Sequence, residues 1–512
     1  MADVTEQDMT TTEQDTAREH SSEHNSEQRQ SSRNEERVNR LGTGKVSKLM
    51  LEFAIPSIIG LVVNGLYNII DSIFLGHGVG LVGQATASVA MPVMIVGMAV
   101  AMLIGNGGNA LVALRLGEGK LKEAEKVMGT TFIMTIVAGV VVTAIILLFM
   151  DPVLMISGAT ELTRDSAHKF LTIISFGLIV LFLGMGFNNF IRTAGDPNRA
   201  LYTMVAGTLV CIALNYLFVM VLGWGVEGSA WATVIGQAVS AVLVMWFFTV
   251  SKKAPFKLRI ANLKPKLRMV FNILALGSAS FALQISAAVL AFVLNNLLKD
   301  YGAMDPITAD GAIAAINVVQ RVAMFAFFPI MGVAIAAQPL FGFNYGAQYF
   351  ARVKITFRLA FIWVMVIGVF FWLLVHIFPE QIIGIFGIEP GLVAFTVDAL
   401  KVQMMLMPVV GLQVVSANYF QSTGQPGRSM LLSLTRQLLY LLPLMYLMPQ
   451  FLPLLIEGVT PLQSLYYTYP VADFLSIFTA AVLMVFEFKK LNKKISEAKG
   501  NFVEKQATEL PA

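Results

Sequence analysis

Long apolar runs separated by short polar segments make up most of the chain between residues 51 and 488. Each run reaches the roughly 20 residues that an α-helix needs to cross a bilayer. The runs are continuous, whereas strands of a transmembrane β-barrel are segments of about ten residues with alternating character. The pattern therefore predicts an all-α integral membrane protein with twelve transmembrane helices, at residues 51–75, 86–113, 127–150, 168–192, 201–222, 228–251, 270–298, 311–338, 355–378, 392–420, 429–450 and 464–488.

The composition agrees with a chain that lies mainly in lipid. Of its 512 residues, 56% are hydrophobic and 13% are charged, which is about half the charged fraction of a soluble domain. So few charges could not cover the surface of a soluble multidomain protein of this length. The single cysteine, Cys211, excludes an intramolecular disulfide and a cysteine-based metal site.

Basic residues are concentrated on alternate connections between the predicted helices. The connections after helices 2, 4, 6, 8 and 10, together with the helix ends that flank them, carry 17 Lys and Arg residues, whereas the corresponding segments after the odd-numbered helices carry three. Positively charged connections remain on the cytoplasmic side, so we expect a multi-pass protein of the cell membrane with both termini in the cytoplasm. Because these basic residues flank helices, the net charge of +4 does not indicate a nucleic-acid partner.

Two short motifs recur at one spacing, which indicates an internal repeat. Gly195 and Gly424 lie in similar Gly-Pro-Arg turns 229 residues apart, and Gly117 aligns with Gly346 at the same offset. Six helices per copy is an even number, so the two copies are expected to be parallel repeats. The predicted organisation is a cytoplasmic tail, two six-helix lobes and a second cytoplasmic tail, at residues 1–44, 45–260, 261–490 and 491–512. The first tail is polar throughout, so we expect it to be disordered.

Asp71 is the ionisable residue that stands out within the predicted helices. Asn64, Asn68 and Asp71 are spaced by four and three residues, so they share one helical face, and Tyr67 lies beside them. Charged groups in the membrane are costly and mark functional sites by default. A carboxylate in such a place can exchange a proton or bind a sodium ion. The alternative is an interfacial Asp that faces lipid headgroups.

Pro56 interrupts the same predicted helix about four turns before Asp71. Proline removes one backbone hydrogen bond and bends a helix, so Pro56 is a candidate hinge that responds to the charge of Asp71. Prolines are also commoner in membrane helices than in soluble ones, which leaves a purely structural explanation open.

Further polar side chains lie within the predicted helices of both halves. We expect them, with Asn64, Tyr67 and Asn68, to line a substrate cavity between the lobes, although such groups also hydrogen-bond neighbouring helices. The candidates are Asn188, Asn215, Thr233 and Gln237 in the first half and Gln284, Asn295, Gln320 and Gln413 in the second.

Several of these segments resemble the multidrug and toxic compound extrusion (MATE) family, in its MepA-like and DinF-like branch. Pro56 with the run 66–76 resembles the family's first helix, and residues 189–197 resemble the motif that closes its fourth. Residues 225–233 resemble the entry to the sixth helix, and 337–346 the end of the eighth. The resemblance extends over residues 45–490.

This resemblance implies two six-helix lobes and the export of drug-like, often cationic, compounds in exchange for H⁺ or Na⁺. It implies that Asp71 is the coupling residue, and we expect Asn215 and Thr233 to lie near it. The chain departs from the family at other positions: Asn215 occupies the place of a helix-5 acid, Gln284 that of a helix-7 acid, and Val410 that of a helix-10 acid. Fewer charged oxygens weaken a sodium site, so the departures favour proton coupling.

Other functions remain as alternatives. A lipid-linked oligosaccharide flippase of the same superfamily often has additional helices and a strongly cationic cavity, whereas Arg321 and Arg436 are among few basic residues within the helices here. The chain has no Walker-type phosphate loop, no metal-binding His/Glu spacing and no Gly-x-Ser-x-Gly motif, so we expect no enzyme activity and no cofactor. The expected partners are a small drug-like molecule, H⁺ or Na⁺ and the bilayer, with the protein as a monomer.

Overall fold

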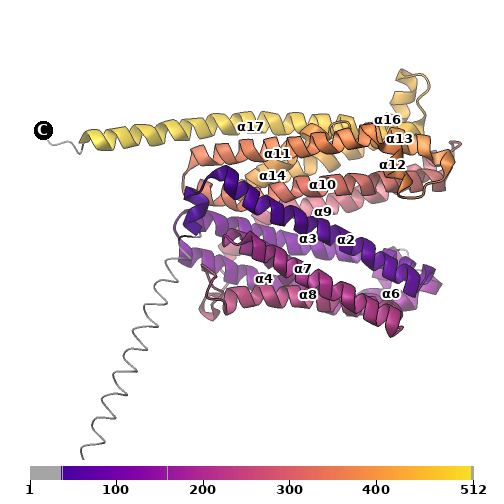
Figure 1. The fold of residues 1–512 in the computed structure, drawn as a ribbon, viewed down its shortest axis with the longest axis horizontal. Helices are drawn as coiled ribbons and strands as arrows, with labels where there is room; N and C mark the ends of the chain where they lie inside the picture. Colours follow the sequence, from indigo (N-terminus) through magenta and orange to yellow (C-terminus); the bar gives the residue numbers. More distant parts are fainter. Residues whose placement is uncertain (1–35, 37, 158–159, 509–512) are drawn as a thin grey trace, which may run out of the picture.

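The computed structural model describes residues 36, 38–157 and 160–508. In this part of the chain every regular element is a helix (Figure 1). Eleven helices are long and apolar enough to cross a membrane, and a bent pair adds one further span. The helices that form the spans are α2 (Val46–Gly78), α3 (Leu81–Gly117), α4 (Leu121–Leu148), α6 (Glu161–Thr193), α7 (Pro197–Asn215), α8 (Gly225–Thr249), α9 (Leu267–Gly302), α10 (Ala309–Gly346), α11 (Phe350–Ile377), α13 (Val393–Gln403), α14 (Met407–Ser422), α15 (Pro426–Leu434), α16 (Leu442–Leu455) and α17 (Pro461–Thr508).

The remaining elements are short. The π-helical turn η1 (Tyr216–Val221) continues α7, and η4 (Thr435–Leu441) joins α15 to α16. Helices α5 (Met150–Ile156) and α12 (Pro379–Gly384) and the 3₁₀ turns η2 (Ile260–Asn262) and η3 (Pro390–Leu392) lie between spans. The predicted twelve-helix, all-α membrane fold is therefore confirmed.

One predicted span is broken rather than continuous. The run 392–420 forms α13 and α14, which meet at an angle of 50°. Pro408 is in the first turn of α14. Proline has no N–H to donate and disfavours a helical conformation in the residue before it, so it begins a helix more readily than it continues one. By contrast, α2 continues through Pro56 as one helix.

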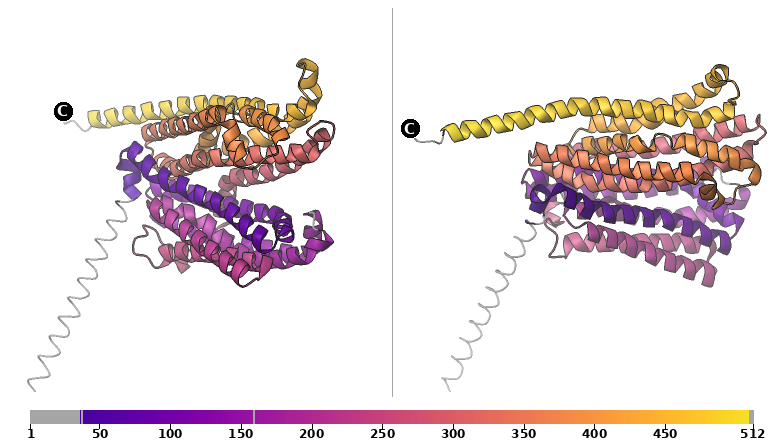
Figure 2. Two further views of the ribbon diagram at one scale, coloured as in Figure 1. Left: turned by 45° about the vertical axis from the view of Figure 1, so that its right-hand side comes forward. Right: turned by 45° about the horizontal axis from the view of Figure 1, so that its top comes forward.

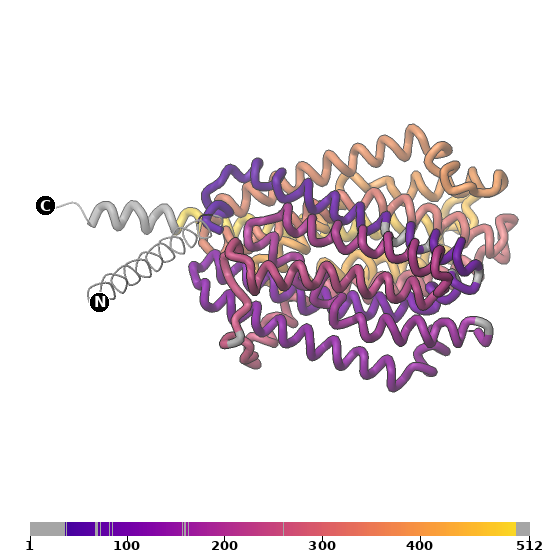
Figure 3. The backbone as a smooth tube through the Cα atoms, turned by 60° about the horizontal axis from the view of Figure 1, so that its bottom comes forward, coloured from indigo at the N-terminus to yellow at the C-terminus, as the bar shows by residue number. Residues whose placement is uncertain are grey.

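Helix α2 begins, and α17 leaves the bundle, at the same end, which the basic residues predict to be cytoplasmic. We call this the inner end and the opposite one the outer end. Helices α4, α7 and α8 lie on one side of the bundle and α11, α16 and α17 on the other, with α2, α3, α9 and α10 between them (Figure 1). Figure 3 shows the same arrangement from the side of the first half. The two halves diverge towards the outer end in the left view of Figure 2.

The two halves meet at the inner end through a reciprocal backbone contact. A Cβ atom on Gly117 would lie 2.0 Å from the carbonyl oxygen of Phe343, and one on Gly346 would lie 2.3 Å from that of Leu114. Only glycine permits so close an approach. Because 114 and 343, like 117 and 346, differ by 229, each half makes the same contact with the other, as an internal repeat requires.

Backbone conformation repeats at the same offset. Gly119 and Gln348 both have positive φ, at 72° and 61°, and so do Gly195 and Gly424, at 83° and 79°. These residues close the turns at the inner ends of α3, α10, α6 and α14. The limits of the two lobes, 45–260 and 261–490, remain predictions.

The predicted tails are only partly described. Residues 1–35 and 37 lie outside the described residues, whereas 38–43 are helical. Leu41 is buried, and its carbonyl oxygen accepts hydrogen bonds from Asn344 (3.1 Å) and Arg352 (3.3 Å). At the other end of the chain, α17 continues to Thr508.

Candidate functional site

Asp71 lies near the outer end of α2, about seven turns from its start. Its Oδ1 atom accepts a hydrogen bond from Asn215 Nδ2 at 2.9 Å and a second from Ser229 Oγ at 3.0 Å. Asn215 is the last residue of α7, and Ser229 lies in the second turn of α8. Three helices of the first half therefore converge on one carboxylate.

The groups around Asp71 are buried and carry no compensating cation. Asn215 and Ser229 are both fully buried. In the part of the chain that the structure describes, the side-chain partners of Asp71 are these two neutral donors, and neither Lys nor Arg forms an ion pair with it. The N-terminus of α8, the positive end of its dipole, lies one turn from Ser229 and favours a negative charge nearby. Among the described residues, the carboxylate is thus held by two neutral hydrogen-bond donors.

Local sequence explains how α7 and α8 present these two donors. The π-helical turn η1 begins immediately after Asn215, and such turns occur frequently at functional sites. Gly223 and Gly225 then adopt positive φ (67° and 60°), which reverses the chain tightly so that α8 packs beside α7.

Thr233 lies one turn beyond Ser229 and contacts this group indirectly. Cys211 Sγ lies 3.7 Å from Asn215 Nδ2 and 3.9 Å from Thr233 Oγ1. The structure thus brings Asp71 and Asn215 together as expected, but the hydroxyl that Asp71 accepts from is that of Ser229. Ser229, Thr233 and Gln237 are spaced by four residues and so share one face of α8. This spacing could have identified Ser229 from the sequence.

The predicted cavity residues fall into separate groups. Asn188 is buried and donates to Ala200 O and Thr203 Oγ1, both at 2.8 Å, so it joins α6 to α7. Gln413 is also buried and donates to Leu432 O at 2.7 Å, joining α14 to α15. These two amides link helices within one half by hydrogen bonds, which was the alternative to lining a substrate cavity.

The other candidates are less enclosed. Asn64, Gln237 and Gln284 are partly buried, Asn295 is exposed, and Gln320 belongs to a network in the second half. The side chains of Tyr67 and Asn68 lie outside the described residues. The placement of Asn64, Gln237, Gln284 and Asn295 is compatible with an inter-lobe cavity, which remains a prediction.

The second half contains a buried ion pair that sequence analysis did not identify. Arg436 Nε donates to Asp473 Oδ1 at 2.5 Å, and Asp473 is only 3% exposed. Nearby, Gln320 donates to Tyr469 Oη at 2.6 Å and accepts from Gln403 Nε2 at 3.4 Å. The second half therefore neutralises its acid with an arginine, whereas Asp71 in the first half has neutral partners.

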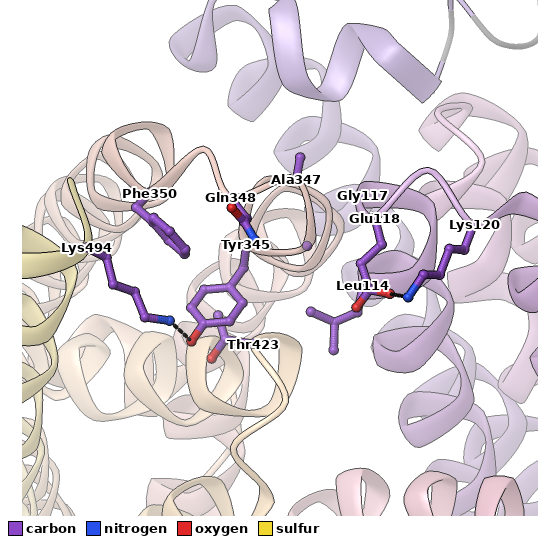
Figure 4. Close-up of a pocket in the computed structure, with 11 residues that line it drawn as sticks. Leu114, Gly117, Glu118, Lys120, Tyr345, Ala347, Gln348, Phe350, Thr423 and Lys494 are labelled. Atoms are coloured by element: carbon purple, nitrogen blue, oxygen red, sulfur yellow. Dashed lines mark hydrogen bonds and ion pairs between the residues drawn. The ribbon is translucent and has the colours of Figure 1, made fainter. Parts of the chain in front are cut away.

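A cavity of about 680 Å³ lies at the inner end, between the turns that follow α3 and α10 (Figure 4). Lys494 Nζ donates to Tyr345 Oη at 3.3 Å on one wall, and Glu118 pairs with Lys120 at 2.9 Å and Arg115 at 2.7 Å on the other. Burial raises the pKa of Glu118, but the hydrogen bonds from Lys120 and Arg115 outweigh it and hold that pKa below its usual range. This cavity is at the opposite end of the bundle from Asp71.

The described residues around Asp71 do not include a metal-binding cluster. Among the described residues, no group of three or more His, Cys, Asp or Glu side chains could hold a metal ion. The three convergent helices hold a carboxylate, and a carboxylate can bind a proton or a monovalent cation that neutralises its charge.

The chain is similar to known transport proteins over most of its length. It is 24% identical over 416 residues to the multidrug export protein MepA of Staphylococcus haemolyticus, which covers 81% of this chain and 89% of that protein. It is likewise 24% identical over 415 residues to MepA of Staphylococcus aureus (81% and 90%). A solved outward-facing conformation of a multidrug resistance MATE family transporter of the MOP superfamily superimposes with a TM-score of 0.81, at 22% identity, over 89% of this chain and 98% of that one.

A family match extends across both halves of the fold. The family model MatE matches residues 56–217 and 307–447, which include Asp71, Asn215 and the Arg436 region. The matched segments cover more than half of the chain and correspond to the two repeats. The chain therefore belongs to the MatE family of twelve-helix membrane transporters, a family of transporters and not of enzymes.

Proposed function

We propose that this protein is a secondary antiporter that exports amphipathic, often cationic, organic compounds in exchange for protons, with Asp71 as the coupling residue. The observation that carries the proposal is the carboxylate of Asp71, bound by Asn215 and Ser229 where three helices meet. Relatives named multidrug export proteins support the substrate class. Two repeated halves that contact each other at the inner end support export by alternating access.

The ligands of Asp71 favour a proton over sodium. Sodium prefers several charged or carbonyl oxygens, but Asn215 and Ser229 both direct donors at Asp71. The Oδ1 atom of Asn215 is buried and has no hydrogen-bond partner among the described residues. Rotation of this amide would turn the unpaired oxygen towards Asp71, where it could accept the hydrogen of a protonated carboxyl. The amide of Asn215 can thus donate a hydrogen bond to the ionised form of Asp71 and accept one from the protonated form.

The transport cycle follows from the charge of Asp71. While Asp71 is ionised, Asn215 and Ser229 hold it and substrate binds between the halves. A proton from outside neutralises the carboxylate, α2 bends at Pro56, and the affinity for substrate falls. Linkage requires the reciprocal effect, so that bound substrate weakens proton binding by the same factor.

The coupling ion is tested in proteoliposomes that contain the purified protein and ethidium. A pH gradient imposed alone is expected to drive ethidium transport, and a sodium gradient at constant pH is expected to leave the rate at the level of protein-free liposomes. Transport driven by sodium alone would replace the proton in this proposal by sodium.

Replacing Ser229 with Ala removes one donor to the ionised carboxylate. A hydrogen bond to a charged group contributes roughly 1.5–3 kcal/mol, and about 1.4 kcal/mol corresponds to one pH unit. The ionised form loses stability relative to the protonated form, so half-maximal proton-driven efflux is expected about one pH unit higher. Thr233→Ala is the matched control, since it removes a hydroxyl one turn away. An identical shift in both variants, or none in Ser229→Ala, would contradict the role of Ser229.

A further inference from the structure

Arg192 is 5% exposed, which makes it the least exposed basic residue in the described part of the chain. It lies in the last turn of α6, near the inner end. Its Nη1 donates to Asn189 Oδ1, its Nη2 lies 3.6 Å from Met204 Sδ, and its Nε has no partner in the part of the chain that the structure describes. An amide oxygen and a thioether are weak partners for a guanidinium with five N–H donors.

In contrast to Arg192, the buried acids among the described residues have partners of opposite charge. Glu125, Asp473 and Glu487 are buried, and each pairs with an arginine: Arg259 at 3.6 Å, Arg436 at 2.5 Å and Arg428 at 2.6 Å, respectively. Within the same part of the chain no carboxylate pairs with Arg192. The C-terminus of α6 offers partial compensation through its dipole, but a buried charge without a counter-charge is costly.

A chain of amides links Arg192 to the contact between the two halves. Asn189 Nδ2 donates to Asn106 Oδ1 at 2.9 Å, and Asn106 Nδ2 donates across to Ser280 Oγ of α9 at 3.0 Å. One turn from Ser280, a Cβ atom on Gly277 would lie 1.7 Å from the carbonyl oxygen of Leu103 in α3. The Asn106–Ser280 hydrogen bond joins the two halves, so separating them at the inner end would break it and expose Asn189 and Arg192.

We propose that Arg192 binds the carboxylate of anionic or zwitterionic amphipathic substrates when the halves separate at the inner end. A guanidinium matches a carboxylate with two parallel hydrogen bonds, which is the counter-charge that the buried side chain lacks. Closure at the inner end returns Arg192 to Asn189 and removes it from the substrate, so the affinity for a carboxylate depends on the state of the transporter. This inference rests on the proposed export function and extends its substrate class.

Two dyes that differ in one group test the inference in proteoliposomes of the full-length protein. Rhodamine 110 carries a free carboxylate, and rhodamine 123 is its methyl ester. Arg192→Gln is expected to raise the KM for rhodamine 110 at least tenfold and to change that for rhodamine 123 less than twofold. Arg192→Lys keeps the charge without the planar fork, so an intermediate KM for rhodamine 110 is expected.

Arg199→Gln is the matched control, because Arg199 lies at the same end of the bundle and already pairs with Asp196 at 3.1 Å. It should alter transport of neither dye. Equal losses for both dyes in Arg192→Gln would show a purely structural role and overturn the inference. If that variant does not fold, Arg192→Lys decides: an unchanged rhodamine 110 KM overturns the inference, and a selective rise supports it. Wild-type transport of rhodamine 123 without rhodamine 110 refutes the inference alone, whereas transport of neither dye refutes the proposed export function as well.

Discussion

Replacing Asp71 with Asn is expected to reduce proton-driven ethidium efflux by about 100-fold or more, to the level of protein-free liposomes. The amide cannot ionise, so the two states of the coupling site become one and the pH gradient no longer biases the cycle. Asn is nearly the same size as Asp and can keep a hydrogen bond with Ser229, so the helices should pack as before. The measurement is the initial efflux rate under an imposed pH gradient, with detergent thermal stability as the test of folding.

An ethidium-binding measurement on this variant distinguishes the loss of ion coupling from the loss of the substrate site. Asp71→Asn should still bind ethidium, and the pH dependence of that binding should disappear. Asp473→Asn is the control for removing a buried carboxylate from the other half. Efflux by Asp71→Asn at the wild-type rate, driven by the same gradient, would refute the assignment of Asp71.

Asp473→Asn is expected to lower the stability of the protein more than Asp71→Asn does. It leaves the guanidinium of Arg436 without a counter-charge in the second half, and breaking such a pair from one side costs roughly 3–5 kcal/mol. The contact of Arg436 with the ring of Phe327, at 5.2 Å, remains but does not replace a carboxylate. A lower unfolding temperature in detergent, with proton coupling retained by the folded fraction, is the expected result.

The double variant Arg436→Met with Asp473→Leu tests the electrostatic explanation. Replacing both charges by apolar side chains of similar volume is often neutral or stabilising, so the unfolding temperature should return close to that of the wild type. A double variant as unstable as Asp473→Asn would show that packing around Tyr469 and Gln320, and not the unpaired charge, determines the loss.

The parts of the fold that depend on one helix at a time could be predicted from the sequence. Apolar length determines whether a segment spans a membrane, so all twelve spans were found. Asp71 was identifiable because a lone carboxylate stands out within an apolar helix. The 229-residue offset predicted the repeat that the reciprocal contact of Gly117 and Gly346 then displayed.

The misses concern contacts between helices. Ser229 lies one turn from the residue that was predicted, because the rotation of α8 about its axis depends on its packing against α7. Asn188 and Gln413 were expected at a cavity but are buried ties within a half. Arg192 counted only as a basic residue at a helix end, since its sequence neighbours do not reveal that it is buried.

By itself, then, the amino-acid order determined the twelve spans, the duplicated architecture and Asp71 as the carboxylate that we propose couples transport to an ion. Among the described residues, tertiary structure alone decided that Ser229 joins the expected Asn215 in holding this carboxylate, that Asp473 is neutralised by Arg436, and that Arg192 is buried without a paired acid. The reason is physical: hydropathy and helix periodicity act over a few turns of one segment. Side-chain partners, by contrast, depend on how helices separated by many residues rotate and pack against each other.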